Sequence, residues 1–343
     1  EEAYALSVSE DGVVVRSRSA AGAFYALQTL SQIMTATGEG VSIPECNIED
    51  APQLGWRSFM LDEGRSFKGM AVVKQLMDDM ARLKMNVFHW HLTDDQGWRI
   101  EIRKYPLLTE VGARRDSTQV GWYEYNTYDG KPHEGFYTQA QVKEIIEYAA
   151  ARHITVVPEI EMPGHSAAAV SAYPWLSAAG KQIRVPCKFG VQYNVFNPAD
   201  ERVLGFLEEV LDEVMDLFPS KVIHIGGDEV RYDEWKNSGQ VMDFIAENSL
   251  GSPAGLQVWF TNKIASYIES KGRRMMGWND ITGDQLHHFQ NEAAETTVGL
   301  SPDAVVQFWS GKPELMLKSA RHGNDIVNSF NEYTYLDYST EYN

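Results

Sequence analysis

Seven short apolar runs, separated by stretches of helical periodicity, constrain the fold of this chain more than any other feature. Between the runs, apolar residues recur three and four positions apart, as in Val72, Leu76, Met80 and Leu83, or in Val203, Leu207, Leu211 and Val214. Strands that alternate with helices form a parallel sheet with the helices outside it. The pattern predicts an α/β fold, either doubly wound or closed into a (β/α)8 barrel. The runs are 56–61, 86–92, 154–160, 222–225, 274–277, 304–308 and 326–330.

Polar residues at the ends of these runs favour the barrel. Almost every run is followed by an acid, a histidine, an arginine or a tryptophan, including Asp62, Glu161, Asp228 and Trp309. In a barrel, the active site lies at the carboxyl ends of the strands. A nucleotide-binding sheet would concentrate its signal in one glycine-rich turn, and the sequence has neither a G-x-G-x-x-G nor a Walker motif. We predict a TIM-type barrel of which seven strands are visible and the eighth is missing.

The first 50 residues follow a different pattern. Residues 4–8 and 12–17 are predicted strands, and residues 20–34 have an apolar helical pattern. One hairpin and one helix leave a sheet edge and part of one face uncovered, so this unit is expected to be incomplete. We therefore predict part of a small α+β domain at residues 1–50 and the catalytic barrel at residues 51–343.

The composition of the chain restricts the kinds of partner and substrate that it can bind. A net charge of -18 disfavours phosphate backbones and anionic membrane surfaces, so we expect neither nucleic acid nor membrane as a partner. No run of 18 apolar residues occurs. Cys46 and Cys187 match no metal or redox spacing and are predicted to be free, buried thiols. Neutral substrates suit the chain better.

The strongest chemical signal is the segment 224–229, in which an apolar strand runs into Gly226, Gly227, Asp228 and Glu229. Neighbouring residues on a strand point to opposite faces, so both acids can face one pocket only if the backbone leaves strand geometry, which the glycines permit. When two acids converge, their pKa values move apart, so that one acid is protonated and the other is ionised. Taken alone, the pair is equally well explained as the acidic start of a helix.

Two other strand ends strengthen the catalytic interpretation. Residues 158–166 combine Glu161 with a Pro-Gly bend and His165, although a hydrogen-bonded loop histidine would also explain the latter. In residues 88–98, His89 and His91 share one face, so a metal site with Asp94 has to be considered. We expect no metal and no cofactor, because no third cluster with ligand spacing accompanies these residues.

Arg65 and several aromatic residues complete the candidate set. Arg65 can either pair with Asp62 or donate hydrogen bonds to sugar hydroxyls, and the sequence does not decide between the two. Sugar rings stack their C–H faces on aromatic side chains, so aromatic walls with a few acids suit a neutral carbohydrate, although core packing would explain any one of them. The aromatic residues near strand ends are Trp90, Trp98, Trp278, Trp309 and Tyr335.

In combination, these motifs resemble the β-N-acetylhexosaminidases of glycoside hydrolase family 20. The resemblance extends over nearly the whole chain, and residues 21–30 resemble the helix of the small α+β domain that precedes the barrel in that family. The segments that carry it are 61–67, 89–98, 158–166, 224–230, 277–280, 307–309 and 335–337.

The resemblance implies a retaining hydrolysis of terminal N-acetylhexosamine residues without a protein nucleophile. The 2-acetamido oxygen of the substrate would attack the anomeric carbon, Glu229 would act as acid and then base, and Asp228 would orient the acetamido N–H. The resemblance also implies the contacts of the remaining residues. Tyr335 would bind the acetamido oxygen, Arg65 and Asp337 would bind hydroxyls, Trp278 and Trp309 would enclose the acetamido methyl, and His165 and Glu161 would support the acids.

The sequence departs from the family in two places. Asn279-Asp280 stands where an Asp-Glu pair is usual, and the Trp and Glu of the last barrel strand do not follow Asn343. The chain is therefore expected to be a fragment cut at both ends, with weak or no activity by itself. The alternatives are a non-catalytic carbohydrate-binding barrel and, third, a metal-dependent hydrolase. The family's habit of meeting polymeric glycans suggests a periplasmic or secreted protein.

Overall fold

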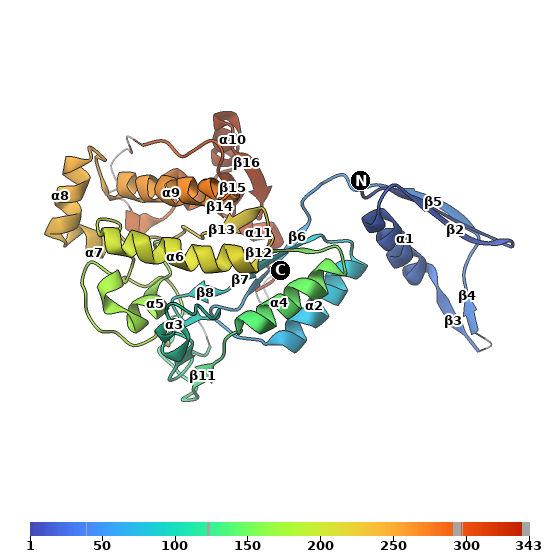
Figure 1. Ribbon diagram of the computed structural model, residues 1–343, viewed down its shortest axis with the longest axis horizontal. Coiled ribbons are helices and arrows are strands. Elements are labelled where there is room, and N and C mark those ends of the chain that lie inside the picture. Colours follow the sequence, from blue (N-terminus) through green and yellow to red (C-terminus); the bar gives the residue numbers. More distant parts are fainter. Residues whose placement is uncertain (39, 122–123, 291–295, 297, 338–343) are drawn as a thin grey trace. The chain divides into compact units, whose positions relative to one another are not determined.

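The computed structural model describes residues 1–38, 40–121, 124–290, 296 and 298–337. Its principal element is a seven-stranded sheet with the order β16-β15-β14-β13-β12-β7-β6 (Figure 1). Neighbours from β12 to β16 pair in parallel. Each strand overlaps one predicted run, so the α/β, TIM-type barrel prediction is confirmed. The strands are β6 (Ser58–Asp62), β7 (Val87–His91), β12 (Thr155–Glu159), β13 (Val222–His224), β14 (Arg274–Trp278), β15 (Val305–Phe308) and β16 (Asp325–Asn328).

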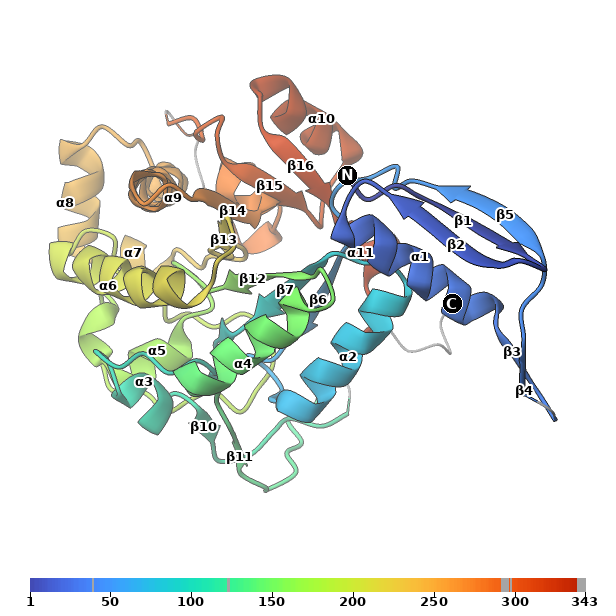
Figure 2. The same cartoon turned by 45° about the vertical axis from the view of Figure 1, so that its right-hand side comes forward.

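Helices follow the strands as the alternation predicts. Figure 2 shows the long helices α6, α9 and α10 on the outer side of β13 to β16. None of the described helices is long and apolar enough to cross a membrane. The helices are α1 (Ala20–Ile33), α2 (Met70–Arg82), α3 (Leu107–Glu110), α4 (Gln139–Ala150), α5 (Ala167–Ala172), α6 (Glu201–Leu217), α7 (Asp233–Lys236), α8 (Gly239–Glu247), α9 (Pro253–Ser270), α10 (Pro313–His322) and α11 (Asn331–Thr334).

The described residues also form three short two-stranded ladders. They pair β3 (Thr35–Thr37) with β4 (Gly40–Ser42), β8 (Thr93–Asp94) with β9 (Gly97–Trp98), and β10 (Arg114–Arg115) with β11 (His133–Glu134). Single 3-10 turns occur at Pro174–Leu176, Asn279–Thr282 and His288–Gln290.

The chain forms two compact units. The first contains Glu1–Leu61, Lys68–His89 and Gln141–Val156, and the second contains Asp62–Phe67, Trp90–Ala140 and Val157–Asn343. The candidate site residues, among them Asp62, Arg65 and Tyr335, belong to the second unit. His89 is the exception and belongs to the first.

In the first unit, the amino-terminal strands form an antiparallel sheet with the order β2-β1-β5. The predicted hairpin is β1 (Tyr4–Ser9) and β2 (Gly12–Ser17), and α1 begins where the Ser19 side chain accepts a hydrogen bond from the Gly22 N–H. The third strand, β5 (Cys46–Asp50), was not predicted, because its polar residues alternate with few apolar ones. This sheet therefore has one more strand than the sequence pattern indicated.

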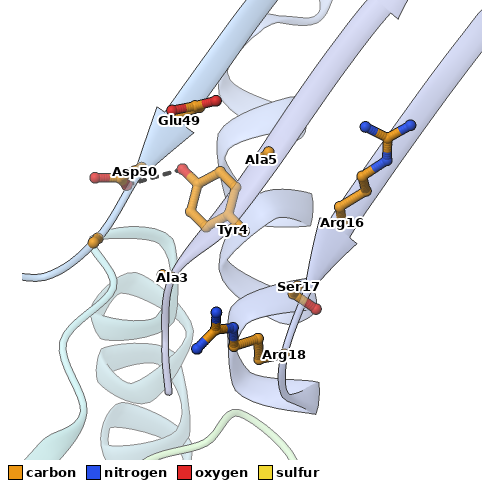
Figure 3. Close-up of a pocket in the computed structure, with 9 residues that line it drawn as sticks. Ala3, Tyr4, Ala5, Arg16, Ser17, Arg18, Glu49 and Asp50 are labelled. Atoms are coloured by element: carbon orange, nitrogen blue, oxygen red, sulfur yellow. Dashed lines mark hydrogen bonds between the residues drawn. The ribbon is translucent and has the colours of Figure 1, made fainter.

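A surface hollow of about 490 Å³ lies beside this sheet. Figure 3 shows Tyr4 at its centre, with Arg16 and Arg18 on one side and Asp50 on the other. The Tyr4 hydroxyl donates to Asp50 at 2.9 Å, and Lys84 Nζ donates to both groups at 2.8 and 2.7 Å. These groups already satisfy one another, so the hollow lacks the converging free acids of a hydrolytic site.

Two packing predictions need correction. In α2, Val73, Met77 and Met80 are buried, whereas Val72 and Leu83 are 47% and 72% exposed. Apolar residues occupy two adjacent stripes of this helix, and periodicity alone does not say which stripe faces inward. The predicted α6 stripe is correct. Cys46 and Cys187 are free as predicted, but they are half-buried rather than buried.

The corrected α2 face leads to a test with two adjacent valines. Val73→Ala is expected to lower the free energy of unfolding by about 1–3 kcal/mol, because it removes fully buried methyl groups. Val72→Ala should change it by no more than about 0.5 kcal/mol, since that side chain is half exposed. Urea denaturation of the two variants measures the difference, and equal losses would contradict the assigned face.

Candidate active site

The backbone after β13 turns so that both acids reach one histidine. Gly226 and Gly227 have φ values of 65° and 89°, and Glu229 itself has a φ of 50°. A Cβ on Gly226 would lie 1.8 Å from Glu161 Oε2, so only glycine lets that carboxylate come so close. Asp228 Oδ2 and Glu229 Oε2 lie 3.4 and 3.3 Å from His165 Nε2. The structure thus brings the two adjacent acids together, as the glycine pair suggested.

His165 joins this pair to a second pair of acids. Its Nδ1 lies 3.1 Å from Asp95 Oδ2 and 3.3 Å from Asp94 Oδ1. Burial lowers the pKa of His165, but Asp94 and Asp228 outweigh that effect and hold it well above its usual value. The four acids around His165 thus favour its imidazolium form. His165 is hydrogen-bonded, as the loop-histidine alternative requires, and it also lies within 3.4 Å of both Asp228 and Glu229.

The pKa values of the acid pair are split. Burial raises the pKa of Asp228, although His165 opposes the shift. Burial also acts on Glu229, but the hydrogen bond and charge of His165 prevail and lower its pKa below the usual value. The split was predicted, but the raised pKa belongs to Asp228 and not to the expected proton donor. The reason is that Glu229 is the more exposed of the two side chains.

His91 contacts three acids of the cluster, and this contact role was not predicted from the sequence. Its ring nitrogens lie 3.2 Å from Asp94 Oδ2, 3.5 Å from Glu161 Oε1 and 3.6 Å from Glu159 Oε2. Burial lowers the pKa of His91, but Glu159, Asp62 and Asp94 raise it to about 9. Burial and the charge of Asp228 hold the pKa of Glu161 well above its usual value. The only signal was the alternation of two histidines in a buried strand.

Arg65 pairs with Asp62, which was one of its two predicted roles, and it also contacts Asp94 of the acid cluster. Its Nη1 lies 2.9 Å from Asp62 Oδ2, and its Nη2 lies 3.0 Å from Asp94 Oδ2. Its side chain remains 30% exposed. It can therefore hold both acids and offer its remaining N–H groups to a ligand.

Three of the aromatic residues lie together. Trp278 Nε1 donates to Glu159 Oε1 at 2.7 Å, and the ring of Trp278 lies edge-on to Trp309 at 6.5 Å. Trp309 in turn stacks on Tyr335 at 6.3 Å. Burial and the charge of Asp228 raise the pKa of the Tyr335 phenol. These residues form an aromatic wall next to the acid pair.

The other predicted aromatic residues are not part of it. Trp90 and Trp98 are 0% and 2% exposed, and Trp90 packs against Tyr137 and Phe218. Both belong to the core, because every residue of β7 and β9, the strands that carry them, is buried. Asp337 is exposed and close enough to Tyr335 for its charge to raise the phenol pKa.

Asp280 is a further residue that the sequence analysis did not assign to the site. Its Oδ1 accepts hydrogen bonds from the Glu229 N–H at 3.1 Å and from His287 Nε2 at 2.7 Å. Its Oδ2 accepts from Trp309 Nε1 at 2.9 Å. One buried carboxylate thus fixes the backbone of Glu229 and one face of the aromatic wall.

Within the described residues of the second unit, three groups of donor atoms are close enough together to hold a metal ion. They are His91 with Glu159 and Glu161, Asp94 with Asp95 and His165, and His165 with Asp228 and Glu229. A metal requires neutral imidazole, whereas the carboxylates around His91 and His165 favour imidazolium. In these groups the imidazoles of His91 and His165 therefore favour a bound proton.

Comparison with known proteins decides the family. The profile "Glycosyl hydrolase family 20, catalytic domain" matches residues 54–343, and the profile for domain 2 of the same family matches residues 1–51. The chain belongs to glycosyl hydrolase family 20.

Individual family 20 proteins agree with this assignment. A β-hexosaminidase of Porphyromonas gingivalis is 38% identical over 95% of this chain and 40% of its own length. The crystal structure of a β-N-acetylhexosaminidase from Bacteroides fragilis superposes with a TM-score of 0.84 and 38% identity, over 98% of this chain and 63% of that one.

A third family 20 protein shows a bound sugar. It is the exo-β-N-acetylglucosaminidase of Vibrio harveyi in complex with N-acetylglucosamine, with a TM-score of 0.83, 34% identity and coverage of 98% of this chain and 51% of that one. The chain spans about half the length of the curated relatives that it matches.

The charge balance predicts that the two site histidines stay protonated at neutral pH. In NMR spectra of ¹⁵N-histidine-labelled protein, the imidazoles of His91 and His165 are expected to be doubly protonated at pH 7.5. His91→Gln and His165→Gln assign the signals, and the exposed His288 serves as internal reference. A neutral His91 at that pH would contradict the assigned charge.

The same shift has a consequence for stability. Folding raises the pKa of His91 from the reference value of 6.5 to about 9. Its stabilising contribution is therefore complete below about pH 6.5 and is lost as the pH rises through about 9. Urea denaturation between pH 6 and pH 10 should show this decline, and the His91→Gln protein should lack that part of it.

Proposed function

We propose that this chain carries the catalytic barrel of a β-N-acetylhexosaminidase, which removes terminal N-acetylhexosamine residues from glycans. The observation that carries the proposal is the pair Asp228 and Glu229, both within 3.4 Å of the His165 imidazolium and beside the Trp278–Trp309–Tyr335 wall. Family membership and the names of the relatives support it.

In the proposed reaction, the acetamido oxygen of the substrate attacks its own anomeric carbon. Glu229 protonates the leaving glycosidic oxygen and then takes a proton from water. Asp228 accepts a hydrogen bond from the acetamido N–H and stabilises the positive charge of the oxazolinium intermediate. Two adjacent acids suit this division, because neither has to reach the anomeric carbon as a nucleophile.

His165 supplies the proton on which this reaction depends. In the free site its positive charge keeps Glu229 ionised. A bound sugar excludes water, which raises the pKa of a carboxyl group and lowers that of an imidazolium. The proton then moves from Nε2 to Glu229 Oε2 across their 3.3 Å contact. Asp94 and Asp95 hold the ring in place for this step.

The remaining residues form the sugar site. Trp278 and Trp309 enclose the acetamido methyl group, and Tyr335 donates its hydroxyl to the acetamido oxygen. Arg65 and Asp337 hold ring hydroxyls, and Glu161 with His165 supports the acids. Arg65 is supported by its partly exposed guanidinium, which keeps donors free beyond Asp62 and Asp94.

We further propose a division into a small α+β domain at residues 1–50 and the barrel at residues 51–343, and a periplasmic or secreted location. The separate matches of the two family profiles support the division. The location is supported by the substrate class, because glycan polymers are met outside the cytoplasm. The presence of both acids and of Tyr335 disfavours the non-catalytic alternative.

Removing either acid tests the assigned roles in the full-length protein. Glu229→Gln is expected to lower kcat on a chromogenic N-acetylglucosaminide by about 10²–10⁴-fold, because no proton reaches the leaving group. Asp228→Asn should cost roughly 10²–10³-fold, or about 3–4 kcal/mol, as for one lost charge-stabilising group. Asp243→Asn, an exposed acid on α8, is the matched control. Near-normal activity of Glu229→Gln would refute the assignment.

The substrate's own role can be tested separately. A glycoside without the 2-acetamido group should react poorly, and a thiazoline mimic of the oxazolinium should inhibit, because the mechanism needs the acetamido oxygen as nucleophile. Activity should not change with a metal chelator, since side chains and substrate perform every step. Equal rates with and without the acetamido group would exclude substrate assistance, and loss of activity with chelator would favour the metal-dependent alternative.

A further inference from the structure

The aromatic wall does not end at Trp309. His287 stacks on Trp309 at 5.8 Å with 29° between the rings, and Phe289 stacks on His287 at 5.1 Å and 4°. Together with Tyr335, these rings form a continuous row that starts at the proposed acetamido pocket. None of the proposed catalytic steps uses His287 or Phe289.

The guanidinium of Arg231 continues this row of aromatic rings. Arg231 Cζ lies 4.7 Å from the ring centroid of Phe289 and 4.3 Å from that of Tyr193, so two rings hold it by cation–π contacts. Stacking uses the faces of the planar guanidinium and leaves the N–H groups along its edge for a partner.

The charge of Arg231 is poorly compensated. Its Nε is buried and has no hydrogen-bond partner within the described ranges. The ion pair that the structure gives it, Nε to Asp233 Oδ2, is long at 3.7 Å. Its side chain is nevertheless 19% exposed. A guanidinium that is held in place and partly exposed is suited to bind a carboxylate or sulfate with the N–H groups of its two Nη atoms.

The row formed by His287, Phe289 and Arg231 lies next to Glu229, the proposed proton donor. Arg231 follows Glu229 by two residues, and Val230 between them is fully buried. Asp280 accepts hydrogen bonds from both the Glu229 N–H and His287 Nε2. A general acid protonates the oxygen of the leaving group, so the leaving group lies next to Glu229. Arg231 and His287 are joined to Glu229 by these contacts, so we expect the sugar beyond the cleaved bond to lie against them.

We propose that Tyr193, Arg231, His287 and Phe289 form a leaving-group subsite for an acidic sugar, such as a uronic acid or a sulfated hexose. This inference rests on the proposed function and adds the class of the second sugar to it. Tyr193, which is 51% exposed, offers apolar surface to the ring. Phe289 and His287 hold Arg231 in place, and Arg231 binds the anion. Because the net charge of -18 repels anions, an anionic leaving group needs a local cation, and Arg231 supplies it.

The test uses the full-length protein and three disaccharides in which N-acetylglucosamine is β-linked to glucose, to glucuronate or to a 6-sulfated glucose. For the native protein, kcat/KM on one of the acidic disaccharides should exceed that on the neutral one by about tenfold, as for one charge-assisted hydrogen-bonded pair. The advantage should shrink at high salt. The two acidic substrates show whether carboxylate or sulfate is preferred.

Variants assign the effect to Arg231. Arg231→Gln should bring the acidic-to-neutral ratio of kcat/KM close to one, and Arg231→Lys should keep part of it, because charge is retained without the planar fork. Arg321→Gln, on the exposed face of α10, removes the same charge elsewhere and should leave the ratio unchanged.

Each outcome is decisive. A native ratio near one, or an unchanged ratio in Arg231→Gln, would overturn the subsite. Failure of the native protein to cleave any of the disaccharides and a simple chromogenic N-acetylglucosaminide would instead overturn the proposed function, and the subsite with it.

Discussion

The site depends on one buried carboxylate, Asp94, which lies against three cations. Arg65, His91 and His165 approach its oxygens at 3.0, 3.2 and 3.3 Å. Burying an isolated charge costs several kcal/mol, and a buried carboxylate persists only where cations and hydrogen bonds replace water. Arg65 and His165 accordingly hold the pKa of Asp94 well below its usual value. The same three cations contact the other acids of the site, so the ionisation of each acid depends on all of them.

Backbone conformation gives these charges their positions. His165 and Glu229 adopt positive φ values of 46° and 50°, which are unfavourable for residues with a Cβ. Gly226 allows the Glu161 carboxylate to lie against the turn after β13. Strain of this kind persists where the surrounding contacts over-determine it, and here those contacts are the ion pairs of His165. The strand ends and the charge network therefore stabilise one another.

The acid pair and the aromatic row are mechanically one unit. Asp280 binds the backbone of Glu229, the ring of His287 and the indole of Trp309. A ligand that moves the row would thus also move the proton donor, since one carboxylate holds both.

The sequence by itself determined the alternation of strands and helices, the acid pair after its glycines and the resemblance to the family, because these are local patterns or motifs of fixed order. It did not determine that Trp90 belongs to the core and Trp309 to the site, which of two apolar stripes of α2 faces inward, or that the raised pKa falls on Asp228 rather than Glu229. Those outcomes depend on burial and on distances between residues about 70 positions apart, such as His165 and Asp95. Only the folded chain brings such groups together, and electrostatic effects decay with distance in space rather than in sequence.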